Sequence, residues 1–258
     1  MSGIKTEQID GVLKITLNRP DKFNSFNREM ALALQHALDK AAHDKKVRCV
    51  YTTGEGKAFC AGQDLSEAMD DKGPGIERIV REHYNPIIEK IRSLEKPVVC
   101  AVNGVAAGAG ANIALACDIV VAGNSVAFIQ AFSKIGLIPD SGGTYFLPRL
   151  VGFGKASALM MLGDKVTATD AEHMGMIYKV ISDATLQEEA FAIAKTVSEL
   201  PTIAIGLTKR LLNQSMYNPL DKQLEYEADT QVHSAQSKDY TEGVKAFLEK
   251  RKAVFSGE

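Results

Sequence analysis

Hydrophobic and polar residues follow two different periods in the first part of the chain. Residues 7–17 alternate with the two-residue period of a half-buried strand on either side of Asp10-Gly11, which predicts a β-hairpin. After Asn27, apolar residues recur every three or four positions as far as His43. This second period predicts an amphipathic helix with Asn27 as its N-cap.

Strands and helices then alternate. Short apolar runs at 48–53, 97–102 and 119–122 predict buried strands, and the patterns at 76–94 and 109–116 predict helices. The alternation indicates an α/β fold with crossover connections. The spacing of about 45 to 50 residues between the first two runs resembles a repeated unit.

The hydrophobic pattern of the sequence changes after Pro201, where only helical periods remain. These patterns cover 203–212, 220–232 and 240–254. We therefore expect residues 1–200 to form the core and residues 201–258 to form a helical segment that packs on a neighbour or on another subunit.

Composition narrows the possible functions. The 258 residues include 30 basic and 32 acidic side chains, so the formal net charge of -2 offers no global field for nucleic acid or an anionic membrane. The first ten residues lack the apolar stretch of a secretory signal, which predicts a cytoplasmic protein. Residues 97–117 carry no charge, but proline and glycine interrupt them, so a membrane span is not expected.

Cysteine and histidine spacing gives no sign of a metal site. The four cysteines lie far apart without a CxxC pair, which argues against zinc and disulfides, and we expect them to be buried. The five histidines show no HxxxH or HExxH spacing.

Three segments could carry chemistry, each with a purely structural alternative. Residues 104–110 are rich in glycine and begin in an expected loop at 103–108, but they lack the spacing of a dinucleotide-binding loop. The helix that starts after the loop could stabilise an oxyanion at its N-terminus, or its small residues could serve only close packing. The glycine in 59–64 lets the backbone approach a ligand. Asp140 lies in a Pro-Asp-Ser-Gly sequence, where aspartate usually serves turn formation.

In this order, the segments resemble the enoyl-CoA hydratase/isomerase (crotonase) superfamily over essentially the whole chain. The motifs that carry the resemblance lie at 17–20, 24–26, 58–64, 96–97, 103–110, 117–119, 136–144 and 242–252. The resemblance implies an α/β fold built as a spiral of repeated ββα units, followed by a helical trimerisation region. It also implies an acyl-CoA substrate, no separate cofactor, and a homotrimer or a dimer of trimers.

The resemblance further implies roles for individual residues. The backbone N–H groups of Gln63 and Ala109 would form an oxyanion hole for the thioester carbonyl, where preorganised donors are typically worth about 3 to 4 kcal/mol each. The positions expected to contact CoA are Lys22, Phe23, Ala61, Gln63, Asp64, Leu65, Phe247 and Lys250.

Departures from the family pattern favour an isomerase. Hydratases of the family place two glutamates around a water, and those positions align with Asn112 and Phe132, which cannot transfer protons. Asp140 falls where isomerases carry a single acid/base carboxylate. We expect Asn112, Phe132 and Ile138 to line the substrate pocket. Enclosure by Phe132, Leu137 and Ile138 should raise the pKa of Asp140.

Among isomerase branches, residues 103–111 and 131–140 most resemble the ring-epoxide isomerases of aerobic phenylacetate degradation, which convert ring-1,2-epoxyphenylacetyl-CoA to oxepin-CoA and also shift double bonds of enoyl-CoA. One alternative is a hydratase that uses Asp140 and a water held by Asn112. Another is a non-catalytic CoA- or RNA-binding relative, against which Asp140 and the near-neutral charge speak.

Overall fold

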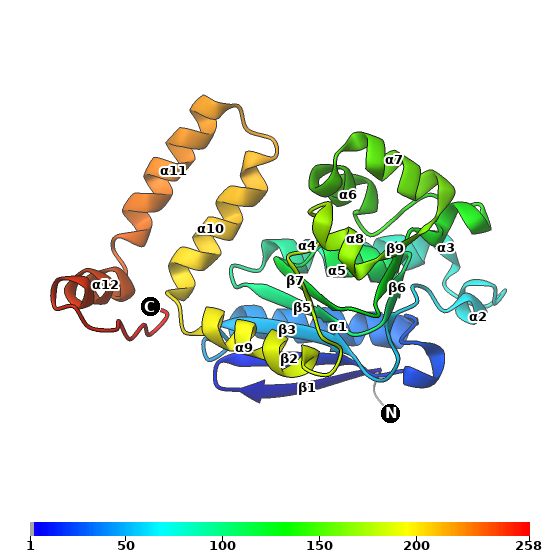
Figure 1. Cartoon of the computed structure of the whole chain (residues 1–258), viewed down its shortest axis with the longest axis horizontal. Coiled ribbons are helices and arrows are strands. Elements are labelled where there is room, and N and C mark those ends of the chain that lie inside the picture. The colour runs from blue at the N-terminus through cyan, green and yellow to red at the C-terminus, as the bar shows by residue number, and fades with distance from the viewer. Residues whose placement is uncertain (1–2) are drawn as a thin grey trace.

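Two β-sheets form the centre of the computed structural model, which describes residues 3–258 (Figure 1). The larger sheet has the spatial order β1 (Ile4–Ile9), β2 (Val12–Leu17), β3 (Cys49–Gly54), β5 (Val98–Val102), β7 (Ile119–Gly123) and β10 (Lys179–Ile181). The smaller sheet has the order β4 (Ala58–Cys60), β6 (Val105–Ala107), β8 (Ala127–Ile129) and β9 (Lys165–Thr167).

A repeated unit connects the two sheets. Each of β3, β5 and β7 in the larger sheet is followed directly by a short strand of the smaller sheet, β4, β6 or β8. The successive strands pair in parallel in both sheets: Val50 lies opposite Val98, and Ala58 lies opposite Val105. The predicted repeat is therefore confirmed.

The repeat also corrects one prediction, because residues 103–108 are not entirely loop. Val105–Ala107 forms β6, in which Ala106 pairs with Cys60 on one side and with Phe128 on the other. A strand of three residues is too short to show a hydrophobic period, so only its neighbours in space define it.

Helices cover the sheets. They are α1 (Arg28–His43), α2 (Leu65–Ala68), α3 (Gly75–Arg78), the π-helical η2 (Ile79–Tyr84), α4 (Asn85–Ser93), α5 (Ala109–Leu115), α6 (Gly143–Val151), α7 (Phe153–Leu162), α8 (Ala168–His173) and α9 (Leu186–Ser198), with 3-10 turns at Pro20–Lys22 and Ala131–Ile135. The Asn27 side chain accepts from the Met30 N–H at 3.0 Å, which confirms the predicted cap. Residues 75–93 are helical without a break, which confirms the helix expected at 76–94. This run consists of α3, η2 and α4, and η2 is π-helical.

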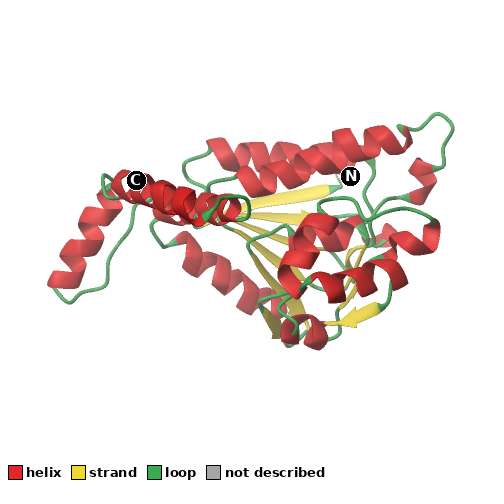
Figure 2. Cartoon of the chain, turned by 90° about the horizontal axis from the view of Figure 1, so that it is seen from above, coloured by secondary structure: helices red, strands yellow, loops and turns green. Residues whose placement is uncertain are grey.

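Three C-terminal helices lie to one side of the sheets: α10 (Thr202–Ser215), α11 (Leu220–Ser234) and α12 (Lys238–Leu248) (Figures 1 and 2). The last helix is shorter than predicted, because Lys250 has a left-handed φ of +54° that a continuing helix does not allow. Large apolar side chains such as Leu220 and Phe247 are exposed on these helices. A role of residues 201–258 in oligomerisation stays a prediction.

All four cysteines are buried and free, as expected. Within residues 3–258, no group of three or more histidine, cysteine, aspartate or glutamate side chains is arranged to hold a metal ion. In the same range no single helix is long and apolar enough to cross a membrane; α9 and α10 meet that criterion only as a pair, which is bent by 103°.

A buried ion pair attaches α10 to the core. The Lys209 ammonium group lies 2.7 Å from the Asp118 carboxylate and donates to the Ile91 carbonyl at 2.7 Å. Asp118 also accepts from Arg92 at 3.0 Å and from the Val98 N–H at 2.8 Å. Burial lowers the pKa of Lys209, although Asp118 opposes this effect. A single carboxylate thus joins α4, β5 and α10.

We expect Asp118→Asn to lower the free energy of unfolding by about 3 to 5 kcal/mol, because it leaves Lys209 buried without a counter-charge. Glu95→Gln is the control, since it removes the exposed Arg210–Glu95 pair and should cost at most about 1 kcal/mol. Urea unfolding of both variants measures the difference. Equal losses in the two variants would show that the buried pair contributes nothing special.

Candidate active site

A mainly apolar cavity of about 410 Å³ lies beside the N-terminus of α5. Its wall is made by residues within 61–68, 76–84, 108–109 and 131–140. Seven predicted site residues line it: Ala61, Gln63, Leu65, Ala109, Phe132, Ile138 and Asp140. The fold therefore brings these residues together from three successive repeats.

The first oxyanion candidate is the backbone N–H of Gln63. Phe26 bonds to the two residues that flank Gln63: the Phe26 N–H donates to the Gly62 carbonyl at 2.7 Å, and the Phe26 carbonyl accepts from the Asp64 N–H at 2.8 Å. The Gln63 N–H has no acceptor within residues 3–258 and belongs to a residue of the cavity wall. It is free to donate to a ligand.

The second candidate is the N–H of Ala109, the first residue of α5. The first N–H groups of a helix have no partner inside the helix, and the helix dipole favours negative charge there. Gly108 precedes it with φ +52° and ψ -126°, a conformation that glycine adopts most readily. A Cβ added at Gly62 would lie 3.6 Å from the Ala109 nitrogen, so the two donor segments are close neighbours.

The side chain of Gln63 is held in place by hydrogen bonds. The Tyr84 hydroxyl donates to Gln63 Oε1 at 2.8 Å, and Gln63 Nε2 donates to the Glu67 carboxylate at 3.1 Å. Burial raises the pKa of Tyr84 well above its ordinary value, so the hydroxyl keeps its proton. The donor loop is thereby fixed before a ligand binds.

Asp140 is the one carboxylate on the described part of the cavity wall. Burial raises the pKa of Asp140, as expected from its apolar surroundings, and the Ser141 hydroxyl, which donates to Oδ1 at 2.9 Å, lowers it only in part. The turn that follows is strained at Ser141, which has a left-handed φ of +52°. A carboxyl with a raised pKa suits both accepting and returning a proton.

Asn112, expected in the pocket, lies behind the wall instead of on it. Its Nδ2 donates to the Asp140 carbonyl at 2.8 Å, and its Oδ1 accepts from Gln130 Nε2 at 2.8 Å. With both ends of the amide bonded and the side chain buried, Asn112 has nothing to offer a substrate.

Asp64 is likewise occupied by the protein and is absent from the wall. Its carboxylate accepts from Arg19 at 2.8 Å and from the Ser66 N–H at 3.1 Å. Burial by itself raises the pKa of Asp64, but the Arg19 and Ser66 hydrogen bonds outweigh it and lower the pKa. The structure thus gives Asp64 a cap and an ion pair where a CoA contact was expected.

The remaining predicted CoA positions separate into two groups. Lys22 and the exposed Phe23 lie next to the cavity, since the Ala61 N–H donates to the Phe23 carbonyl at 3.0 Å. Phe247, 82% exposed, and Lys250 lie at or after the end of α12, at the opposite end of the molecule from α2 (Figure 1). One chain by itself does not bring the two groups together.

Sequence reasoning missed three supporting residues: Tyr84, Glu67 and Gln130. Tyr84 and Gln130 bond to residues that are 21 and 18 positions away, and no local pattern marks such pairs. Glu67 lies four residues after Gln63, a spacing from which their hydrogen bond could have been predicted. The buried positions of Tyr84 and Gln130 could not be told from sequence periodicity.

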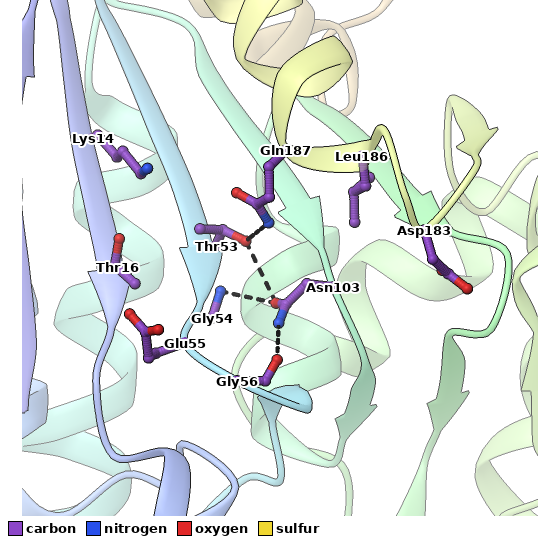
Figure 3. Close-up of a pocket in the computed structure, with 10 residues that line it drawn as sticks. All are labelled: Lys14, Thr16, Thr53, Gly54, Glu55, Gly56, Asn103, Asp183, Leu186 and Gln187. Atoms are coloured by element: carbon purple, nitrogen blue, oxygen red, sulfur yellow. Dashed lines mark hydrogen bonds between the residues drawn. The ribbon is translucent and has the colours of Figure 1, made fainter.

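A second cavity, of about 390 Å³, contains none of the predicted site residues (Figure 3). It lies between β2, β3 and α9, and its polar side chains bond one another. Asn103 accepts from the Gly54 N–H at 2.9 Å and donates to the Gly56 carbonyl at 2.9 Å, while Gln187 donates to Thr53 at 3.0 Å. Asn103, part of the 103–110 motif, therefore serves the fold.

Comparison with known proteins identifies the family. The family model described as enoyl-CoA hydratase/isomerase matches residues 7–258. The chain belongs to this family. The crystal structure of a Mycobacterium abscessus protein assigned to the enoyl-CoA hydratase/isomerases superposes with a TM-score of 0.94 at 38% identity, covering 99% of this chain and 100% of that one. The crotonase fold predicted from the motifs is thereby confirmed.

Two relatives represent the two activities in the name of the enoyl-CoA hydratase/isomerase family. The 1,2-epoxyphenylacetyl-CoA isomerase of Escherichia coli K12 is 47% identical over 96% of this chain and 95% of its own. A Rhodobacter capsulatus protein named "Probable enoyl-CoA hydratase" is 42% identical over 98% of each chain. The protein is thus an enzyme of the acyl-CoA hydratase/isomerase type.

We expect Ala109→Pro to lower kcat by about 10²- to 10³-fold, because it removes one oxyanion donor. Proline is tolerated at the first position of a helix, so α5 should still form. Ala109→Gly, which keeps the N–H, is the matched control and should remain active. Steady-state kinetics with circular dichroism tests this, and an active, folded Ala109→Pro enzyme would rule out the Ala109 donor.

We expect Asp140→Asn to raise the melting temperature at about pH 8. The folded-state pKa of Asp140 is raised, so ionisation of this carboxyl costs stability once the pH exceeds that pKa, and the cost vanishes below the unfolded value of about 3.9. The difference between variant and wild type should therefore shrink as the pH falls towards about 4. A variant that melts lower than wild type at about pH 8 would contradict a destabilising carboxylate.

Proposed function

We propose that the protein is an acyl-CoA isomerase in which one carboxylate, Asp140, moves the proton. The observation that carries this proposal is the composition of the cavity wall, which within residues 3–258 offers one carboxylate among apolar side chains and two free backbone donors. Hydration by the usual route needs two carboxylates around a water. A proton shift within one substrate needs only one.

The proposed reaction has two steps. Asp140 takes a proton from the carbon next to the thioester carbonyl, and the electron pair of that C–H bond moves to the carbonyl oxygen as an enolate. The N–H groups of Gln63 and Ala109 stabilise this negative charge. Asp140 then returns the proton to the far end of the conjugated system, which converts a 3,4 double bond to a 2,3 double bond without gain or loss of atoms.

Within this class, we propose ring-1,2-epoxyphenylacetyl-CoA as the substrate and oxepin-CoA as the product. The name of the Escherichia coli relative supports this choice, as does the apolar wall that Phe132 provides for a ring. The conversion is an isomerisation, so it consumes no water. Δ3–Δ2 enoyl-CoA isomerisation is expected as an accompanying activity.

A hydratase is the second candidate, favoured by the Rhodobacter capsulatus relative. This candidate requires a water held by Asn112, whose amide is already bonded at both ends. The hydratase therefore needs an additional group that the described part of the cavity wall does not supply.

The proposal includes an assembly and a location. A homotrimer or a dimer of trimers would let Phe247 and Lys250 reach the CoA bound by another subunit, which a single chain does not allow. CoA is part of the substrate, and no further cofactor is proposed. Phenylacetate catabolism in the cytoplasm stays a prediction from the sequence.

We expect wild type to isomerise a 3-enoyl-CoA and to hydrate crotonyl-CoA poorly, and Asp140→Asn to lose isomerisation by about 10²- to 10⁴-fold, the usual contribution of a general acid/base. Spectrophotometric assays of both substrates, side by side, measure this. Asp183→Asn, in the second cavity, controls for loss of a carboxylate as such. Hydration of crotonyl-CoA that survives Asp140→Asn would return the protein to the hydratases.

A further inference from the structure

Two buried amides connect Gln130 to the backbone of Asp140. Gln130 Nε2 donates to Asn112 Oδ1 at 2.8 Å, and Asn112 Nδ2 donates to the Asp140 carbonyl at 2.8 Å. Asn112 is 1% exposed and Gln130 is 4% exposed. Neither side chain lines the cavity, so neither amide contacts a substrate there.

The orientation of both amides follows from the Asp140 carbonyl. A carbonyl oxygen can only accept, so Asn112 must turn its NH₂ group towards Asp140. The Asn112 side-chain oxygen then faces Gln130, which must donate a hydrogen bond to it from its own NH₂ group. Gln130 thereby fixes Asn112 in the orientation that binds Asp140.

This arrangement has a cost. Within residues 3–258 the Gln130 Oε1 atom is buried without a hydrogen-bond partner. A buried oxygen that has lost its hydrogen bonds to water and gained none in the protein lowers stability. The glutamine therefore satisfies the buried oxygen of Asn112 while its own oxygen stays without a partner.

The Asn112 side chain also connects Asp140 to the helix that carries an oxyanion donor. Asn112 lies one helical turn after Ala109 on α5, so one short helix carries both an oxyanion donor and the group that holds Asp140. Contact with the turn is close, because a Cβ at Gly143 would overlap the Asn112 side-chain nitrogen. The Asp140 carbonyl also accepts from the Gly143 N–H at 2.9 Å, which closes the strained turn.

We propose that Asn112, oriented by Gln130, is a positioning residue that sets the place of the Asp140 carboxyl relative to the oxyanion donors of Gln63 and Ala109. The inference rests on the proposed function, in which Asp140 moves the proton. Asn112, at the position where hydratases carry a glutamate, then has a different role here, because it orients the Asp140 carboxyl. A misplacement of about 1 Å in such a site can cost on the order of 10²-fold in rate.

The test uses Asn112→Leu and Gln130→Met in the full-length enzyme. Both should lower kcat for a 3-enoyl-CoA by about 10- to 100-fold, while KM and the affinity for acetyl-CoA stay unchanged, because the CoA contacts and oxyanion donors remain. The double variant should be no slower than Asn112→Leu, since the two residues act in one chain. Gln130→Met removes the unpaired oxygen of Gln130 but leaves Asn112 Oδ1 without a donor, so its melting temperature should stay close to that of wild type and the variant should remain measurable if Asn112→Leu fails to fold.

Asn213→Leu is the matched control. Asn213 likewise donates to a backbone carbonyl, that of Arg92, at 2.9 Å and accepts from a side chain, but it lies between α4 and α10, away from the cavity. It should lower the melting temperature and leave kcat unchanged.

Two outcomes overturn the inference and are distinguishable. If Gln130→Met and every folded Asn112 variant keep wild-type kcat while Asp140→Asn is inactive, the positioning role is wrong and the proposed function stands. If Asp140→Asn keeps wild-type activity, the proposed function fails and the positioning role fails with it.

Discussion

Parallel pairing of the short strands β4, β6 and β8 is the constraint on which the site depends. Because parallel strands point the same way, the segments that follow them emerge at one edge of the small sheet. The segment after β4 supplies the Gln63 N–H, the segment after β6 supplies the Ala109 N–H, and the segment after β8 leads to Asp140. Three successive repeats thus contribute one functional group each to a single cavity.

Several locally unfavourable features of the described chain lie around this cavity. Ser141 has a left-handed φ, Asp140 is a carboxyl held among apolar residues, and Gln130 keeps a buried oxygen without a partner. Strain and unpaired groups of this kind persist only where the surrounding structure holds them. The support comes from the buried sheets and from ion pairs such as Asp118–Lys209, which lie outside the cavity wall.

The family carries two activities on one fold, and the difference depends on a few side chains. The proposed oxyanion donors are backbone groups, which the fold supplies whatever the side chains are. The carboxylates are side chains, and the resemblance to hydratases predicts that Asn112 and Phe132 stand where those enzymes carry two of them. Asn112 bonds to Asp140 and Phe132 makes the wall apolar, so both residues agree with the proposed proton transfer by Asp140.

The sequence by itself determined the elements with a clear hydrophobic period, the family, and the residues of the cavity wall that ordered motifs mark, among them Gln63, Ala109 and Asp140. It could not determine β6, the end of α12 or the bonds of Asn112 and Asp64. Short strands, left-handed residues and paired buried polar groups depend on partners distant in the chain, and no local pattern encodes those. Tertiary structure alone decided that Asn112 and Asp64 face the protein and that Phe247 lies far from the cavity of its own chain.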